Sequence, residues 1–239
     1  MKNIILVFVS LMLILTPVSQ SRAQAAIFVL IFGDKVASEN FHLSLDIGVN
    51  ISNMSGYDDG KGMVGMNFGL GTHIKFNDRW FLAPEIKPVS RKGARDVTNP
   101  IKPIEGFDVS ETNSRIKLNY LEIPILVQYR LQSGWYFSAG PQLSFLTSAN
   151  QETEIILTNG TTVDVEQGIQ SKFKDFDWAF PVEIGYAFKD KRGGKGMDIR
   201  ARYSYGFNEI FEDDTGFSAN HSTFQFIATF PFVETKEGK

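Results

Sequence analysis

The side chains best able to carry acid–base chemistry are three histidines, His42, His73 and His221. His73, Ser44 and Asp46 together have the composition of a hydrolytic set, in which a base activates a serine nucleophile. The alternation of residue types places His42 and His73 on the polar faces of two extended strands. The alternative interpretation is that they fill the interior of the fold, because spacing alone does not bring a nucleophile within reach of a base.

Other kinds of site have weaker support. The pairs Asp58-Asp59 and Asp213-Asp214 lie in polar loops, where they are either weak cation ligands or solvated carboxylates. The absence of cysteine excludes thiol catalysis and cysteine-ligated metal, and a net charge of −3 provides no basic field for nucleic acid. The glycines of GMVGMNFGLG precede no helix and therefore do not form a phosphate loop. We expect no catalytic residue, no metal, no cofactor and no nucleic-acid partner, hence a protein that is not an enzyme.

The N-terminus has the features of an export signal. Lys2 precedes an apolar run over residues 4–15, and Ala23-Gln24-Ala25 has the form of a cleavage site. The apolar run is shorter than the roughly 20 residues that a membrane-spanning helix needs. We predict a signal peptide over residues 1–25, a short apolar segment over 26–40 and a polar tail over 234–239. An uncleaved anchor is the alternative.

Between these ends the apolar residues alternate with polar or small ones, which predicts β-strands. We expect eight strands, at residues 42–52, 63–76, 80–89, 121–131, 135–145, 175–188, 197–206 and 222–232. Short turns at 77–79, 132–134 and 189–196 alternate with longer polar connections at 55–62, 91–114, 147–174 and 207–221. This rhythm is typical of a transmembrane β-barrel with short periplasmic turns and long extracellular loops. The predicted fold is therefore an all-β, antiparallel up-and-down barrel over residues 41–233, in the outer membrane.

The alternating faces indicate which side of the barrel meets lipid. One face carries more large apolar side chains than a narrow interior can hold, whereas the other is rich in Gly, Ser and Ala. Trp80 and Trp135 follow short turns and Trp178 follows a long loop, so they mark opposite rims as an aromatic girdle does. We therefore expect the apolar face to contact outer-membrane lipid.

The polar face then collects charged residues in the barrel interior. An Arg or Lys facing lipid at mid-membrane costs about 2–4 kcal/mol, whereas inside the barrel it can meet an acidic partner. We expect a near-balanced interior network that fills the lumen and leaves no general diffusion pore. Its predicted members are Asp46, Lys75, Glu85, Lys87, Glu122, Arg130, Glu183, Asp198, Arg200 and Arg202.

The stretch LEIPILVQYRL contains an irregularity. Upstream of it, Arg115 and Lys117 are polar at odd positions; within it, Glu122 and Gln128 are polar at even ones. Because Pro124 cannot donate to a sheet ladder, we expect a one-residue bulge between residues 119 and 124 that reconciles the two parities.

The same residues carry a family resemblance. NYLEIPILVQYRL followed by GWYFSAGPQLSFL resembles the PorT-like outer-membrane β-barrel proteins of Gram-negative bacteria, and the likeness extends over roughly residues 26–232. The resemblance implies an outer-membrane location. For the best-known members it also implies a part in protein secretion across the outer membrane by the type IX route.

One loop has a pattern of its own. Asn159-Gly160 between β-rich flanks predicts a hairpin with a two-residue turn, either as a simple extension of the barrel strands or as a platform for a partner. The leading function is a non-enzymatic barrel that serves protein secretion or cell-envelope assembly, with other secretion or envelope proteins as partners of the extracellular loops. The alternatives are a small outer-membrane enzyme acting on lipid or peptide at the outer rim, and a soluble ligand-binding barrel.

Overall fold

The computed structural model describes residues 41–57, 59–104, 109–189 and 195–231. The predicted signal peptide, the apolar segment 26–40 and the polar tail lie outside the described residues. None of the described residues belongs to a helix that is long and apolar enough to cross a membrane.

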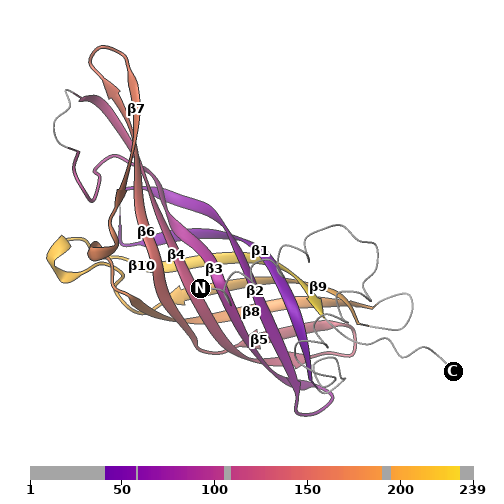
Figure 1. Cartoon of the computed structure of the whole chain (residues 1–239). Helices are drawn as coiled ribbons and strands as arrows, with labels where there is room; N and C mark the ends of the chain where they lie inside the picture. The colour runs from indigo at the N-terminus through magenta and orange to yellow at the C-terminus, as the bar shows by residue number, and fades with distance from the viewer. Residues whose placement is uncertain (1–40, 58, 105–108, 190–194, 232–239) are drawn as a thin grey trace, which may run out of the picture.

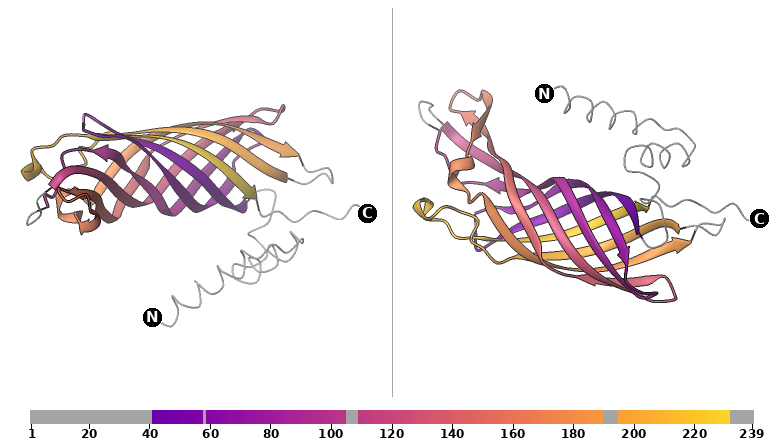
Figure 2. Two further views of the ribbon diagram at one scale, coloured as in Figure 1. Left: turned by 90° about the horizontal axis from the view of Figure 1, so that it is seen from above. Right: turned by 60° about the horizontal axis from the view of Figure 1, so that its bottom comes forward.

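The described residues form one antiparallel sheet that closes on itself (Figures 1 and 2). Its strands are β1 (Phe41–Ser55), β2 (Lys61–Lys75), β3 (Trp80–Val97), β4 (Val109–Arg130), β5 (Trp135–Ala139), β6 (Gln142–Leu157), β7 (Thr162–Gly168), β8 (Phe176–Lys189), β9 (Lys195–Gly206) and β10 (Asn220–Pro231). Two short 3₁₀ helices, η2 (Gln170–Lys172) and η3 (Asp213–Thr215), lie in the connections.

The ten strands occupy eight places around the ring. β5 and β6 are two parts of one strand that is interrupted at Gly140–Pro141, since both pair with β4 on one side and β8 on the other. β7 pairs with β6 at the long-loop end and lies outside the ring. Pairing of β1 with β10 closes the barrel. The predicted eight-stranded up-and-down barrel is confirmed.

The exterior is apolar along the middle of the barrel. Large hydrophobic side chains on every strand of the ring are exposed, among them Val49, Met66, Val127, Val182 and Phe226. Most of their neighbours in sequence are buried, and many of these are polar, among them Asn50, Asn67, Gln128, Glu183 and Gln225. This is the reverse of a soluble barrel and the arrangement expected where lipid surrounds the strands.

Two connections are shorter than predicted because the strands continue into them. β3 extends to Val97 and β4 begins at Val109, so most of the expected loop 91–114 is sheet. Likewise β6 and β7 occupy much of the expected loop 147–174. The strands therefore rise well beyond the apolar belt at the long-loop end, which is the extracellular end of such barrels.

The expected bulge in β4 is wrong. Even-numbered residues face the interior along the whole strand, from Ser114 through Glu122 to Gln128. The irregularities lie on the neighbouring strands, between Lys87 and Ser90 of β3 and at Thr147 of β6. What changes along β4 is its surroundings. On the N-terminal side of Glu122, toward the long-loop end, most interior residues are apolar and the exterior residues are polar.

Candidate functional site

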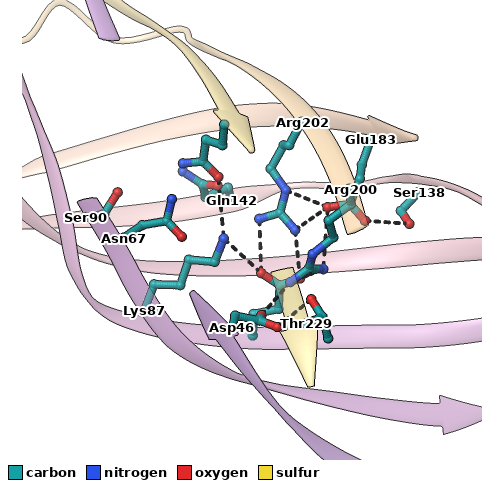
Figure 3. A network of polar contacts seen from close by, with 12 residues as sticks. Asp46, Asn67, Lys87, Ser90, Ser138, Gln142, Glu183, Arg200, Arg202 and Thr229 are labelled. Carbon is teal, nitrogen blue, oxygen red and sulfur yellow. Dashed lines mark hydrogen bonds and ion pairs between the residues drawn. The ribbon is translucent and has the colours of Figure 1, made fainter. Parts of the chain in front are cut away.

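Two arginines of β9 organise the centre of the barrel (Figure 3). Arg200 and Arg202 lie on the same face of β9 because they are two residues apart on one strand, and both are buried in the interior. Arg202 donates to Glu85 at 2.7 and 3.0 Å and to Glu183 at 2.7 and 2.9 Å. Arg200 donates to Glu85 at 2.6 Å and to Asp46 at 2.5 Å. The two guanidinium groups therefore tie together strands β1, β3, β8 and β9.

Neutral and basic neighbours complete this central network. Lys87 lies 3.3 Å from Glu85 and donates to Gln225 at 3.4 Å. Thr229 donates to Asp46 at 2.8 Å, and Ser138 donates to Glu183 at 3.1 Å. Three carboxylates thus face three cations, all buried, and their side chains fill this level of the interior.

The other predicted members of the network lie elsewhere. Arg130 is 3.6 Å from Asp198, and its guanidinium lies over the rings of Phe81 and Tyr136 nearer the short-turn end. Lys75 is not brought into the interior group, since it pairs at 2.7 Å with Asp78 in the exposed turn.

Glu122 pairs with a residue that sequence reasoning missed. Its partner is Lys92, at 2.6 Å, and both side chains are buried. Lys92 also lies 5.0 Å from the centre of the Tyr120 ring, whose hydroxyl is 3.1 Å from Nε2 of His221. The sequence predicts a loop at Lys92. The residue types at Lys92, Gly93 and Ala94 do not alternate clearly enough to extend the predicted strand at 80–89.

Above this level an apolar core closes the interior. Strand residues meet residues of the connections that follow β7 and β9, and Phe173 pairs with Phe211 through an isolated β-bridge. In this core the ring centroids of Tyr57, Phe211 and Phe217 lie 5.4–5.6 Å from one another. Its buried members are Met54, Tyr57, Ala94, Val97, Ile101, Ile116, Leu118, Tyr120, Leu146, Ala149, Ile169, Phe173, Ile210, Phe211 and Ala219. The lumen is therefore sealed twice, by charge pairs at mid-height and by apolar packing at the long-loop end.

The tryptophans of the predicted girdle all lie on the exterior. Trp80 and Trp135 begin β3 and β5 at the short-turn end, and Trp178 lies near the opposite end of the ring on β8. Each packs against a neighbouring aromatic ring, with the two ring centroids 4.5–5.2 Å apart. The pairs are Trp80–Tyr129, Trp135–Tyr186 and Trp178–Phe207.

The hydrolytic set is not assembled. His73 stacks on His42 with ring centroids 4.7 Å apart, while Asp46 accepts from Arg200 and Thr229. Among the described residues Oγ of Ser44 has no hydrogen-bond partner, and so no base there to activate it. His42 and His73 also face one another near the short-turn end, away from the outer rim where the enzyme hypothesis placed the chemistry.

One loop carboxylate has a clear structural role. Asp59 accepts hydrogen bonds from the backbone and hydroxyl of Thr98 at 3.0 and 2.8 Å and from the backbone of Asn99 at 2.5 Å. Partial burial opposes ionisation, but these hydrogen bonds outweigh it and lower the pKa of Asp59 below its ordinary value. Among the described residues no group of three or more acidic or histidine side chains is placed to hold a metal ion, and Asp213 pairs with Lys174 at 3.0 Å.

At the outer end a hairpin projects beyond the ring (Figure 1). We call residues 150–168, which comprise the end of β6 and all of β7, the outer hairpin. Its turn has three residues rather than the predicted two: Gly160 donates to Leu157, Leu157 donates to Thr161, and Gly160 has a φ of 82°. This is a type I turn followed by a left-handed glycine.

The outward face of the outer hairpin is acidic. In the register Glu152 faces Glu166 and Glu154 faces Asp164, so two like-charged pairs lie next to each other. Hydrogen bonds from Leu157 to Thr161 and from Ile169 to Ala149 place these pairs at the non-hydrogen-bonded sites, where opposed side chains are closest. Lys117 pairs with Glu152, and Asn150 donates to Glu166 at 2.8 Å. A cleft of about 530 Å³ adjoins them, lined by Asn113, Arg115, Glu152, Thr153, Glu154, Asp164, Val165 and Glu166.

Three solved structures similar to this chain are outer-membrane or surface proteins. Neisserial surface protein A is 12% identical, with 80% of this chain and 97% of that chain covered and a TM-score of 0.41. Ail, the attachment invasion locus protein of Yersinia pestis, is 15% identical (81% and 99% covered, TM-score 0.42). The outer membrane protein OprG from Pseudomonas aeruginosa is 10% identical (83% and 98% covered, TM-score 0.40). A comparison with curated proteins gave no match.

The family comparison covers most of the sequence. Residues 19–212 match the model of a family described as the outer membrane protein beta-barrel domain. This span includes strands β1 to β9, the outer hairpin and the charged residues of the central network; Gln225 and Thr229 on β10 lie beyond it. With its closed ring of strands and apolar exterior, the chain belongs to the outer membrane β-barrel domain family and is a protein of the outer membrane.

Proposed function

We propose that this protein is a closed, non-enzymatic barrel that presents the outer hairpin to a partner in protein secretion or cell-envelope assembly. The observation that carries the proposal is the contrast between the two ends of β6. At mid-height its neighbours seal the lumen, whereas beyond the rim it continues into a hairpin whose second strand, β7, lies outside the ring.

The sealed interior supports a role other than diffusion. Solute passage would require breaking the charge pairs of Arg200 and Arg202 as well as the apolar core above them. The unassembled state of Ser44 and His73 supports a role other than hydrolysis. Both observations direct attention to the exterior at the long-loop end.

The outer hairpin has the properties of a docking surface. Opposed like charges destabilise a sheet by a few tenths to about 1 kcal/mol for each pair. The two adjacent acidic pairs therefore repel one another, and contact with a basic partner would reduce this repulsion. Among the strands that the structure describes, β7 has a neighbour on one edge only. An edge without a neighbour accepts an extended segment from another chain. The resemblance of LEIPILVQYRL and its flanks to the PorT-like proteins points to secretion as the process served.

The experiment compares exported proteins in cells that lack the gene and carry either the wild type or a hairpin variant. Thr153 and Val165 lie opposite one another, so an Asn-Gly turn can join them in place of residues 154–164. We expect exported proteins to accumulate in the periplasm of the deletion strain and of the shortened variant, while the shortened barrel still folds.

A charge variant refines the test. Glu154→Gln/Asp164→Asn keeps the hairpin but removes two of its carboxylates, and Glu209→Gln/Asp213→Asn makes the same charge change in the connection before β10. We expect an export defect from the first pair and none from the second. Unchanged export in the deletion strain itself would remove secretion from consideration, and unchanged export in the shortened variant alone would remove the hairpin.

A further inference from the structure

A group of cations lies on the outward face of strands β2, β3 and β4 at the long-loop end. We call it the basic band; its members are Lys61, Arg91, Arg95, Arg115 and Lys117, all of them exposed. The sequence predicts loops at Lys61, Arg91 and Arg95, whereas the structure places all five residues on strands. Strands β2 to β4 are adjacent in the ring (Figure 1). The outward side chains at one end of these strands are therefore neighbours on the surface.

The basic band begins directly where the apolar exterior ends. Arg91 of β3 faces Asn119 of β4 in the register. The next outward positions toward the membrane are Val89 on β3 and Leu121 on β4, and below them lies the exposed Ile86. The lowest cations of the band are therefore at the level at which lipid acyl chains give way to headgroups.

On strands β2 to β4 the outward cations exceed the outward acidic groups, which are Asp96 and Glu111, although the acidic face of the outer hairpin adjoins this surface at Arg115. Asp96 pairs with Arg95 at 2.9 Å and with Lys61 at 3.3 Å, and Glu152 pairs with Lys117. Two carboxylates thus offset two of the five positive charges. In the part of the chain that the structure describes, neither Arg91 nor Arg115 forms an ion pair. Arg91 faces Asn119, whereas Arg115 faces Glu152 in the register and borders the acidic cleft.

The band occupies one side of the barrel. On β1 and β10 the outward residues just beyond the apolar surface are Asn53 and Ser222, which face each other and are uncharged. A general need for solubility would distribute charge around the rim, whereas a one-sided group of cations indicates a site.

We propose that the basic band binds the phosphate groups of the phosphorylated glycolipid in the outer leaflet of the membrane. Arginine matches a phosphate with two parallel hydrogen bonds, and each exposed cation near an anionic membrane surface adds attraction. Arg91 and Lys117 are diagonal neighbours across the β3–β4 pair, because Arg91 faces Asn119, so their long side chains can reach one phosphate. The acyl chains of the same lipid then lie against Val64, Met66 and Ile86, which are 47–69% exposed.

The binding experiment uses the full-length mature protein, folded in detergent, and native mass spectrometry. The probes are lipid A with its two phosphates, the same lipid with the phosphates removed, and inorganic phosphate. The variant is Arg91→Gln/Arg115→Gln, which removes the two cations of the band that form no ion pair among the described residues. The matched control is Lys102→Gln/Lys174→Gln, which removes two cations from connections at the same end. Retarded gel mobility after heating reports that each barrel is folded.

We expect phosphorylated lipid A to bind the wild type and the control equally and the band variant about 30-fold more weakly, as each cation near an anionic surface contributes about 1 kcal/mol and 1.4 kcal/mol is tenfold. Arg91→Lys/Arg115→Lys should retain most of the affinity. If the double variant does not fold, Arg115→Gln alone should weaken binding about fivefold.

Three results would overturn the proposal. One is equal affinity of the wild type for the phosphorylated and dephosphorylated lipids. The second is undiminished lipid binding by the folded band variant. The third is inorganic phosphate binding as tightly as the lipid, which would assign the band to a free anion. This lipid site is independent of the hairpin's role in export, so either proposal can fail without the other.

Discussion

Arg202 is the interior residue whose removal we expect to destabilise the barrel most. Its guanidinium is fully buried and donates four hydrogen bonds, two to Glu85 and two to Glu183. Arg202→Met preserves much of the side-chain length but leaves three carboxylates facing two cations. Removing one partner of a buried ion pair costs about 3–5 kcal/mol, mostly because the remaining charge is buried without compensation. We therefore expect the free energy of unfolding to fall by about that amount.

The measurement is urea unfolding in lipid vesicles, followed by the fluorescence of the three exterior tryptophans and by gel mobility. Arg202→Met/Glu183→Gln restores two carboxylates facing two cations, so we expect it to recover at least half of the lost stability. Lys75→Met, which removes an ion pair in an exposed turn, should cost only about 0–1 kcal/mol. A loss below about 1 kcal/mol for Arg202→Met, or no recovery in the double variant, would refute the reasoning that charge balance governs the interior.

Three further outcomes follow from other parts of the barrel. Gly93→Ala should cost about 1–3 kcal/mol in the same assay, because Gly93 has a φ of 148° and an added Cβ would lie 1.9 Å from the carbonyl oxygen of Ile116. Val182→Arg, on the exposed apolar face of β8, should cost about 2–4 kcal/mol in vesicles, whereas Val182→Leu should cost little. Because the pKa of Asp59 is lowered on folding, its contribution to stability is present above its ordinary pKa and lost as pH falls through the lower, folded value. Backbone hydrogen exchange at Thr98 and Asn99 should accordingly rise in acid, and Asp59→Asn should raise it at neutral pH with less dependence on acid.

Sequence alternation was sufficient for the ring of strands and for the inward side of each strand, but not for where the strands end. In a strand surrounded by lipid, polar residues face inward; in a strand surrounded by water, they face outward. Arg115 and Lys117 are outward polar residues above the membrane, and Glu122 is an inward polar residue within it. A bulge and a change of surroundings produce the same switch of parity, so the sequence did not distinguish them.

The same ambiguity concealed Lys92 and the basic band. Residues 91–96 are polar or small on both faces, because the interior there holds Ala94 beside Lys92 while the exterior carries Arg91 and Arg95. With neither face consistently apolar, the segment resembled a loop. The partner of Glu122 depended on strand register across the barrel, which no local pattern encodes.

The change of surroundings along β4 also explains why the outer hairpin can serve as a fixed platform. An isolated two-stranded hairpin is marginally stable in water. Here β4 adds a third strand to it, pairing with β6 up to Leu157, while Ile116 and Leu118 of β4 point into the apolar core beneath. Ile155 of the hairpin is itself fully buried. Because the strands beyond the membrane have an apolar interior of their own, the acidic face above them is held by packing as well as by backbone hydrogen bonds. A partner that binds there meets an already ordered surface and loses less free energy to ordering it.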